Sequence, residues 1–135
     1  MKALLTKHAA KPIALATLWI GLSEFVRNQL LFANYWVVHY EKLGLTFPAA
    51  PINGMVWMLW SCAFAATLYI LSQKFTLQQV FVIGWWLGFV MMWLVIGNLG
   101  VLPYTLLIWA IPLSILETYI AVWLIFQLNT SHKIS

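Results

Sequence analysis

Residues 77–96 read LQQVFVIGWWLGFVMMWLVI, and none of these side chains carries a charge. About 20 apolar residues are what a helix needs to cross a hydrocarbon layer roughly 30 Å thick. Lipid offers the backbone no water to bond, so an apolar run of this length is expected to be helical. Thr76 directly precedes the run, and Gln79 follows three positions later. This spacing predicts a capping box at the start of the helix.

Three further apolar segments flank this one, which gives predicted spans at about 12–33, 51–73, 77–97 and 103–128. None of them alternates apolar and polar residues as the strands of a membrane barrel do. We therefore expect an all-α integral membrane protein, a four-transmembrane-helix bundle in a single membrane domain covering 1–135. Pro51 and Pro103 stand where helices should begin. The first helix is expected to continue to about Leu43 and to end at a left-handed Gly44.

The composition of the whole chain supports a membrane location. Of its 135 residues, 64% are hydrophobic and only 7% are charged, with a mean hydropathy of +0.91. A soluble domain carries roughly 25% charged residues, so the chain cannot be an ordinary soluble enzyme, a disordered tail or a nucleic-acid-binding module. Its expected partner is the lipid bilayer, with no nucleic acid.

Lysines predict the orientation of the spans. With four spans, Lys2, Lys7, Lys11, Lys74 and Lys133 all fall on one side, and the other side has only Lys42, next to Glu41. Cytoplasmic loops carry the excess of Lys and Arg in membrane proteins. Both termini are therefore expected to be cytoplasmic, and we expect the bacterial inner membrane as the location.

Charged residues inside two of the spans predict a functional site. Glu24, Arg27 and Asn28 share one helix face, because they are three and four residues apart. Glu117 lies at a similar depth in the fourth span. A charge at the bilayer centre costs roughly 2.5–3.5 kcal/mol on insertion scales, so it needs a partner or a role. We expect these four residues to form a ligand-binding site near the midplane, with one of the two glutamates protonated. A simple ion pair that pins two helices together, and an outward-pointing Arg27, remain alternatives.

Tryptophan and glycine add two further predictions. The chain has nine Trp. Trp36, Trp57, Trp93 and Trp109 are expected in an aromatic belt at the outer interface, whereas Trp60, Trp85 and Trp86 lie deeper and are predicted to wall a ligand. Gly84 and Gly88 form a Gly-x-x-x-Gly pair, typical of a close helix packing or dimerisation face. A homo-oligomer or a membrane partner is therefore expected.

No cofactor or metal site is expected. The three histidines, His8, His39 and His132, are scattered, and Cys62 is the only cysteine. Four ligands brought together by spacing are what a structural zinc site needs. The chain also contains no glycine-rich phosphate loop.

Three functions remain open from the sequence. The first is binding or transport of a small apolar or cationic molecule at the Glu/Arg site, with proton exchange on a glutamate as the coupling step. The second is a structural or accessory subunit of a larger membrane complex. The third is a lipid- or isoprenoid-modifying enzyme that uses Glu24 and Glu117 as acid and base; a role other than catalysis is favoured.

In length, in span number and in the glutamate of its first span, the chain is similar to small multidrug resistance transporters. It departs from them in having Arg27 beside that glutamate and Glu117 in the fourth span. No activity is carried over from that resemblance.

Overall fold

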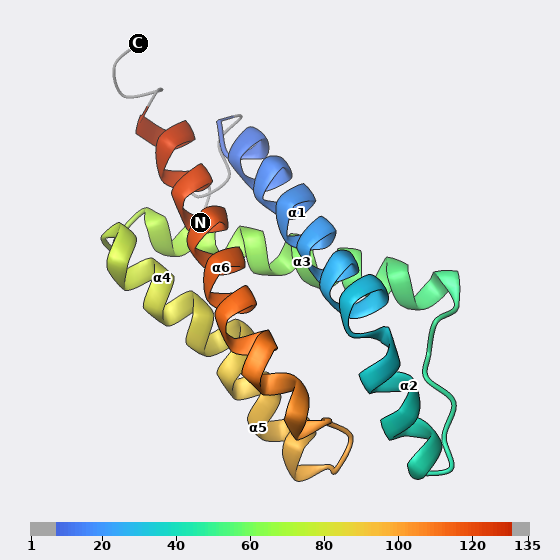
Figure 1. Ribbon diagram of the computed structural model, residues 1–135. Helices are drawn as coiled ribbons and strands as arrows, with labels where there is room; N and C mark the ends of the chain where they lie inside the picture. Colours follow the sequence, from blue (N-terminus) through green and yellow to red (C-terminus); the bar gives the residue numbers. More distant parts are fainter. Residues whose placement is uncertain (1–7, 131–135) are drawn as a thin grey trace.

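The computed structural model describes residues 8–130, and within this range the chain is helical with no strand. Figure 1 shows the helices in chain order. They are α1 (Ala10–Phe25), the π-helical turn η1 (Val26–Leu31), α2 (Ala33–Lys42), α3 (Pro51–Ser72), α4 (Leu77–Trp85), the π-helical turn η2 (Trp86–Val90), α5 (Met91–Asn98), the 3-10 turn η3 (Tyr104–Leu106) and α6 (Leu107–Thr130).

Three of the helical stretches are long and apolar enough to cross a membrane. They are Pro51–Ser72, Leu77–Asn98 and Tyr104–Asn129. The second combines α4, η2 and α5 into one helix, and the third combines η3 with α6. Much of their apolar surface is exposed, Ile108 and Leu59 being 72% and 70% accessible. Such surfaces are favourable against lipid and unfavourable in water, so the chain is an integral membrane protein.

The first apolar segment is helical from Ala10 to Leu31 and then breaks at Phe32. A continuous helix to Leu43 was expected from the sequence, and that expectation is wrong at this residue. Phe32 leaves the helical conformation with φ −119°, and its side chain, 7% exposed, packs in a small cluster with Leu106 and Ala110. The burial of the Phe32 ring offsets part of the free-energy cost of interrupting the helix. The next helix, α2, has no buried residue.

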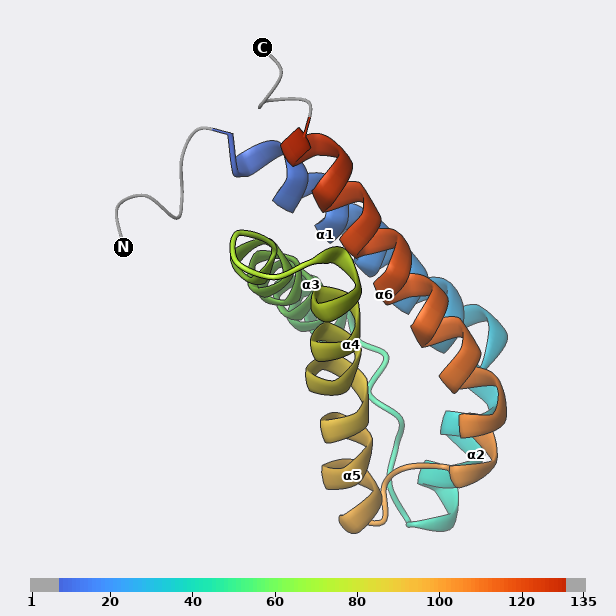
Figure 2. The same cartoon turned by 90° about the vertical axis from the view of Figure 1, so that its left-hand side faces the viewer.

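The helices pack as an α1–α6 pair with α3 across it. Figures 1 and 2 show α1 and α6 side by side and antiparallel, while α3 crosses both at a steep angle. The helix of α4 and α5 lies on the other side of α6. The core between these helices consists of fully buried apolar side chains, among them Ile20, Ala65, Leu68, Val80, Val122 and Ile125. The first and last described helices are therefore direct neighbours.

Local sequence signals account for several helix ends. Thr76 N–H donates to Gln79 Oε1 at 3.0 Å, and Gln79 N–H donates to Thr76 Oγ1 at 3.4 Å, which confirms the predicted capping box. Pro51 is the first residue of α3, where its missing N–H costs nothing. Gly44 follows α2 with φ +72°, which confirms the left-handed end.

Gly84 and Gly88 face α3 of the same chain. A Cβ added at Gly88 would lie 2.7 Å from Phe64 Cζ, and one at Gly84 would collide with Leu68 Cδ2. Both glycines are buried. The pair is thus a close packing face within the chain, and the alternative interpretation as a dimerisation face is wrong, because α3 already fills it.

Candidate functional site

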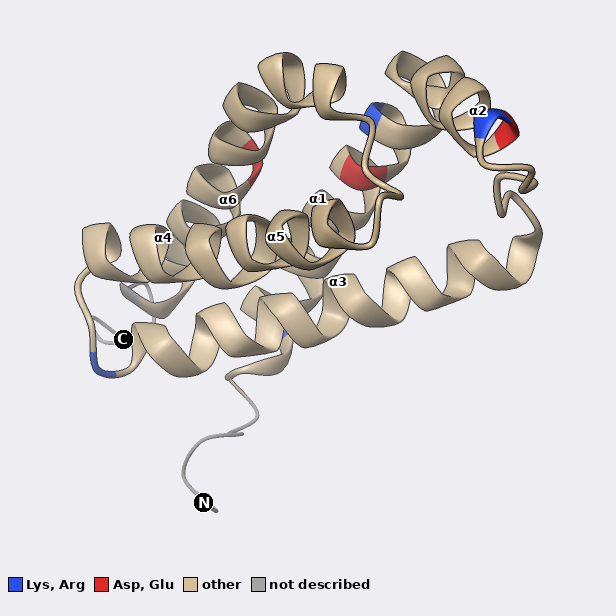
Figure 3. Cartoon of the chain, turned by 90° about the horizontal axis from the view of Figure 1, so that it is seen from below, with Lys and Arg blue, Asp and Glu red and all other residues tan. Residues whose placement is uncertain are grey.

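Glu24, Arg27 and Glu117 meet in the interior, and we call them the charged row. Arg27 Nη1 donates to Glu117 Oε2 at 2.8 Å, and Arg27 Nη2 donates to Glu24 Oε1. The three side chains are buried, with residue exposures of 4% for Glu24, 6% for Arg27 and 2% for Glu117. In Figure 3 the acidic positions of α1 and α6, coloured red, lie near the middle of the molecule, and another charged pair lies at the end of α2. Arg27 therefore points inward.

Asn28 extends the charged row toward α2. Its Nδ2 donates to Glu24 Oε2 at 2.7 Å, and its Oδ1 accepts a hydrogen bond from Trp36 Nε1 at 3.0 Å. Both oxygens of the Glu24 carboxylate are thus occupied. Trp36 belongs to α2, so the position of that helix is linked through Asn28 to the carboxylate. The sequence placed Asn28 in the site but gave no indication of its bond to Trp36.

Glu117 is only partly satisfied. Its backbone carbonyl accepts a hydrogen bond from Trp19 Nε1 at 3.0 Å, and its Oε2 accepts from Arg27. Its Oε1 is buried and has no hydrogen-bond partner among the residues that the structure describes. Two carboxylates and one guanidinium leave a formal charge of −1 on the charged row. No other charged residue comes from α3, α4 or α5, which contain no Asp, Glu, Lys or Arg.

Two π-helical turns shape the site. Arg27 lies in η1 and Phe89 in η2, and the guanidinium carbon of Arg27 lies 5.1 Å from the centre of the Phe89 ring. A cation over an aromatic face at this distance is attracted by the ring. π-Helical turns within α-helices are frequent at functional sites. Here one of them carries the arginine and the other carries the ring beneath it.

A cavity of about 190 Å³ adjoins the charged row, and we call it the aromatic cavity. Glu24, Arg27, Asn28 and Gln29 form its polar wall. Its remaining walls come from α2 and the segment after it, α3, α5 and the segment after it, η3 and α6: Trp36, Tyr40, Phe47, Pro48, Trp57, Met92, Trp93, Ile96, Val101, Leu106 and Ala110. Trp36 and Phe47 are stacked with ring centres 6.1 Å apart. Aromatic walls with few polar groups are typical of small-molecule sites.

The tryptophans that wall this cavity are not the ones expected from the sequence. Trp36, Trp57 and Trp93 line it, although the sequence placed them in an interfacial belt. Depth along a span is visible in a sequence, but the direction of a ring around its helix depends on the neighbouring helices. The hydrogen bond between Trp36 and Asn28 could likewise not be predicted from the sequence.

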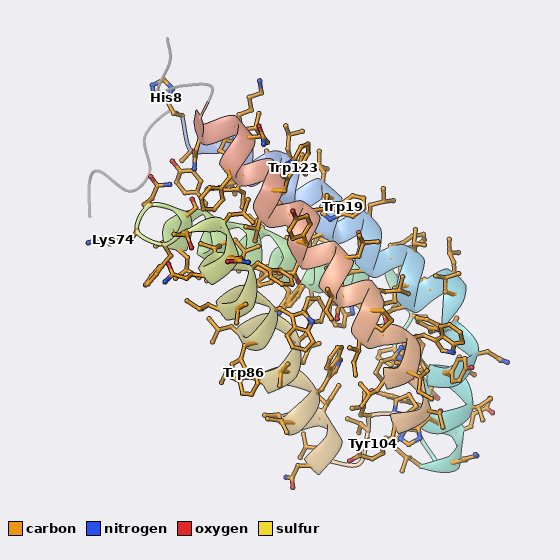
Figure 4. The ribbon with its side chains drawn as sticks, turned by 60° about the vertical axis from the view of Figure 1, so that its left-hand side comes forward. His8, Trp19, Lys74, Trp86, Tyr104 and Trp123 are labelled. Carbon is orange, nitrogen blue, oxygen red and sulfur yellow. The ribbon has the colours of Figure 1, made fainter. Side chains whose placement is uncertain are left out.

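Trp60, Trp85 and Trp86, predicted to wall a ligand, have other positions. Trp60 stacks on Phe64 with ring centres 5.1 Å apart, and Trp85 Nε1 donates to Ser114 Oγ at 3.0 Å. Trp86 is 53% exposed, and Figure 4 shows it on the outside of its helix. None of the three is among the residues of the aromatic cavity. Their expected role as its wall is corrected to helix packing for Trp60 and Trp85, and to an outward position for Trp86.

Metal binding finds no support in the side chains of residues 8–130, where no three His, Cys, Asp or Glu are grouped closely enough to hold an ion. The chain matches no known protein-family model, no curated protein and no solved structure. The chemistry of the site therefore rests on the residues that form it.

Proposed function

We propose that the chain crosses the bilayer four times, with both termini in the cytoplasm of a bacterial cell and the protein in the inner membrane. Besides the three long apolar helices, the crossing nearest the N-terminus is the stretch Ala10–Leu31, in which α1 contributes 16 residues and η1 contributes 6. At roughly 1.5 Å per residue this stretch is about 33 Å long, enough to span the hydrocarbon layer. Lys11 and Lys74 then lie on one side and Lys42 on the other. Lys2, Lys7 and Lys133, which also support this orientation, lie outside the described residues.

We further propose that the protein binds or transports a small apolar or cationic molecule in the aromatic cavity. The observation that carries this proposal is that the aromatic rings and the charged row border one cavity of about 190 Å³. Rings such as Trp57 and Trp93 attract both apolar groups and cations. When both glutamates are ionised, the charged row has a formal charge of −1, which favours a cation over a neutral molecule of the same shape; protonation of one glutamate removes that charge.

Proton exchange is the proposed coupling step. A cation near the charged row competes with a proton for the negative charge shared by Glu24 and Glu117. Binding should therefore strengthen as the pH rises. Arg27 is the charged group that faces both carboxylates, and it holds them close enough to influence each other.

The two alternatives are less well supported by the geometry. A lipid- or isoprenoid-modifying enzyme needs a carboxyl group within reach of its substrate, but Glu24 and Glu117 are 4% and 2% exposed and both are bonded to Arg27. For an accessory subunit, the glycine pair and the tryptophans expected in the aromatic belt would be the surfaces that dock a partner. The glycine pair is filled by α3, and three of the four belt tryptophans line the aromatic cavity.

Equilibrium dialysis against the protein in lipid nanodiscs tests the proposal. The probes are benzyltrimethylammonium and its neutral isostere neopentylbenzene, with empty nanodiscs as the blank. We expect benzyltrimethylammonium to bind more tightly than neopentylbenzene, and this difference in affinity to increase at high pH. Trp57→Ala should weaken it by about tenfold or more, which corresponds to loss of a desolvated cation–ring contact of about 1.4 kcal/mol or more. Trp109→Ala is the matched control, because Trp109 is 57% exposed and is not among the cavity residues.

Two results would remove the proposal. One is equal binding of the cation to protein and to empty nanodiscs. The other is an unchanged pH dependence in both Glu24→Gln and Glu117→Gln. If neither result is found, mass spectrometry of molecules that co-purify with the wild type, but not with Trp57→Ala, identifies the natural ligand. Co-purification of a protein in stoichiometric amount would instead support the accessory role.

A further inference from the structure

A second cavity lies between α1 and α6, and we call it the lateral groove. It measures about 220 Å³ and is lined by Trp19, Leu22, Ser23, Val26, Arg27, Leu31, Leu113, Leu116 and Glu117. Leu22, Leu31 and Leu116 are 59%, 56% and 52% exposed. These exposed leucines show that the groove opens on the side of the molecule, where α1 and α6 face lipid. Arg27 borders both the groove and the aromatic cavity.

Glu117, one of the residues that line the lateral groove, has an unsatisfied polar atom. Glu117 lines the groove and is 2% exposed, yet its Oε1 has no hydrogen-bond partner among the described residues. Its other carboxylate oxygen is already bonded to Arg27. A buried polar atom without a partner is costly, so it marks a place where a ligand or an ordered water supplies the missing bond.

We propose that the lateral groove is a binding site for an aliphatic alcohol that reaches it from the bilayer. A hydroxyl group both donates and accepts hydrogen bonds, so it can satisfy Glu117 Oε1 whether or not that oxygen carries a proton. The aliphatic chain then lies along Leu22, Val26 and Leu116. An ammonium group, which only donates hydrogen bonds, would serve only an ionised carboxylate. This site is separate from the aromatic cavity and does not rest on its proposed ligand.

Photolabelling in lipid nanodiscs tests this site. The probe is octanol carrying a chain diazirine, and the matched control is the same diazirine on octane, which lacks only the hydroxyl. We expect the alcohol to label peptides that contain Leu22, Val26 or Leu116 about tenfold more than the hydrocarbon does, as one hydrogen bond to a buried carboxyl group allows. Unlabelled octanol should compete, whereas octane should not.

Two variants distinguish the contribution of the hydroxyl group to labelling from the contribution of the groove. Glu117→Met removes the acceptor and should reduce labelling by the alcohol to the level of the hydrocarbon. Because that change also removes a partner of Arg27 and could impair folding, Leu116→Trp is the second variant. Leu116 faces lipid, so a larger ring there fills the groove without entering the core. Ile108→Trp is its control, since Ile108 is 72% exposed and does not line the groove.

The outcomes decide the proposal. Loss of alcohol labelling in Leu116→Trp, with normal labelling in Ile108→Trp and Trp57→Ala, supports a specific site in the groove. Equal labelling by the alcohol and the hydrocarbon would mean that the groove holds only an acyl chain and would overturn the proposal. Unchanged alcohol labelling in Leu116→Trp would also overturn it. Because Trp57 lies in the other cavity, failure here leaves the proposed function standing.

Discussion

Arg27 Nη1 donates to Glu117 Oε2 at 2.8 Å, a bond between residues that are 90 positions apart in the chain. It joins the first and last described helices at the point where both are buried. The same guanidinium donates to Glu24 on its own helix. One side chain thus fixes the relative position of α1 and α6 and compensates for two buried carboxylates.

Removing Arg27 should destabilise the protein strongly. In Arg27→Met both carboxyl groups lose their cationic partner in a buried setting, which costs about 3–5 kcal/mol where one partner of a buried pair is removed. Thermal unfolding in detergent should show a clearly lower Tm. Lys42→Met is the control for loss of a positive charge, because Lys42 is exposed at the end of α2 and surface changes of this kind stay within about 0.5 kcal/mol. Equal Tm values for the two variants would contradict a structural role of the charged row.

Much of the architecture could be predicted from the sequence, because the length of an apolar run is itself the physical determinant of a membrane helix. The segments expected at 51–73, 77–97 and 103–128 correspond to Pro51–Ser72, Leu77–Asn98 and Tyr104–Asn129. The proximity of Glu24, Arg27 and Glu117 also followed from the sequence. Depth counted along antiparallel helices and the cost of an unpaired charge leave few other arrangements.

The parts that escaped prediction depend on contacts between helices. Nothing in the residues 26–31 distinguishes a π-helical turn from an α-helical one, and the break at Phe32 is explained only by its packing against Leu106 and Ala110. The position of Trp57 and Trp93 in the wall of the aromatic cavity could not be predicted for the same reason. Their distance from the membrane centre is encoded locally, but the side to which each ring turns is set by its neighbours.

Gly88 should be intolerant of any side chain. In Gly88→Ala the new Cβ would lie 2.7 Å from Phe64 Cζ and 2.8 Å from Cε2, and the Phe64 ring is held by Trp60 and Phe89. Overpacking of this kind costs about 1–3 kcal/mol. Gly54→Ala is the matched control, because nothing lies within 4 Å of its added Cβ and alanine is the better helix former. A Tm that falls only in Gly88→Ala would support this packing, and an equal response of both variants would oppose it.

The bond from Trp36 to Asn28 should hold α2 in place. Without buried residues, this helix is attached through that bond, through His39 Nε2, which donates to the carbonyl of Gly100 at 2.9 Å, and through ring contacts. Trp36→Phe keeps an aromatic ring but removes the donor, and about 1 kcal/mol of local stability is lost with it. Hydrogen exchange of the α2 amides should then accelerate by about fivefold. Trp109→Phe, an exposed position on α6, should leave that rate unchanged, and equal rates in both variants would argue against the link.

The stretch Ala10–Leu31 is expected to cross the membrane, which places Lys11 and Lys42 on opposite sides. Single cysteines test this in a Cys62→Ser background, because Cys62 is exposed and the only cysteine of the chain. A membrane-impermeant maleimide applied to intact cells should label Lys42→Cys but not Lys11→Cys or Lys74→Cys. All three should react once the membrane is permeabilised. If Lys11→Cys and Lys42→Cys were labelled alike in intact cells, the stretch would lie along the membrane surface. Glu24 and Arg27 would then be placed at the headgroups rather than at mid-depth, and a charge there is far less costly than one at the bilayer centre.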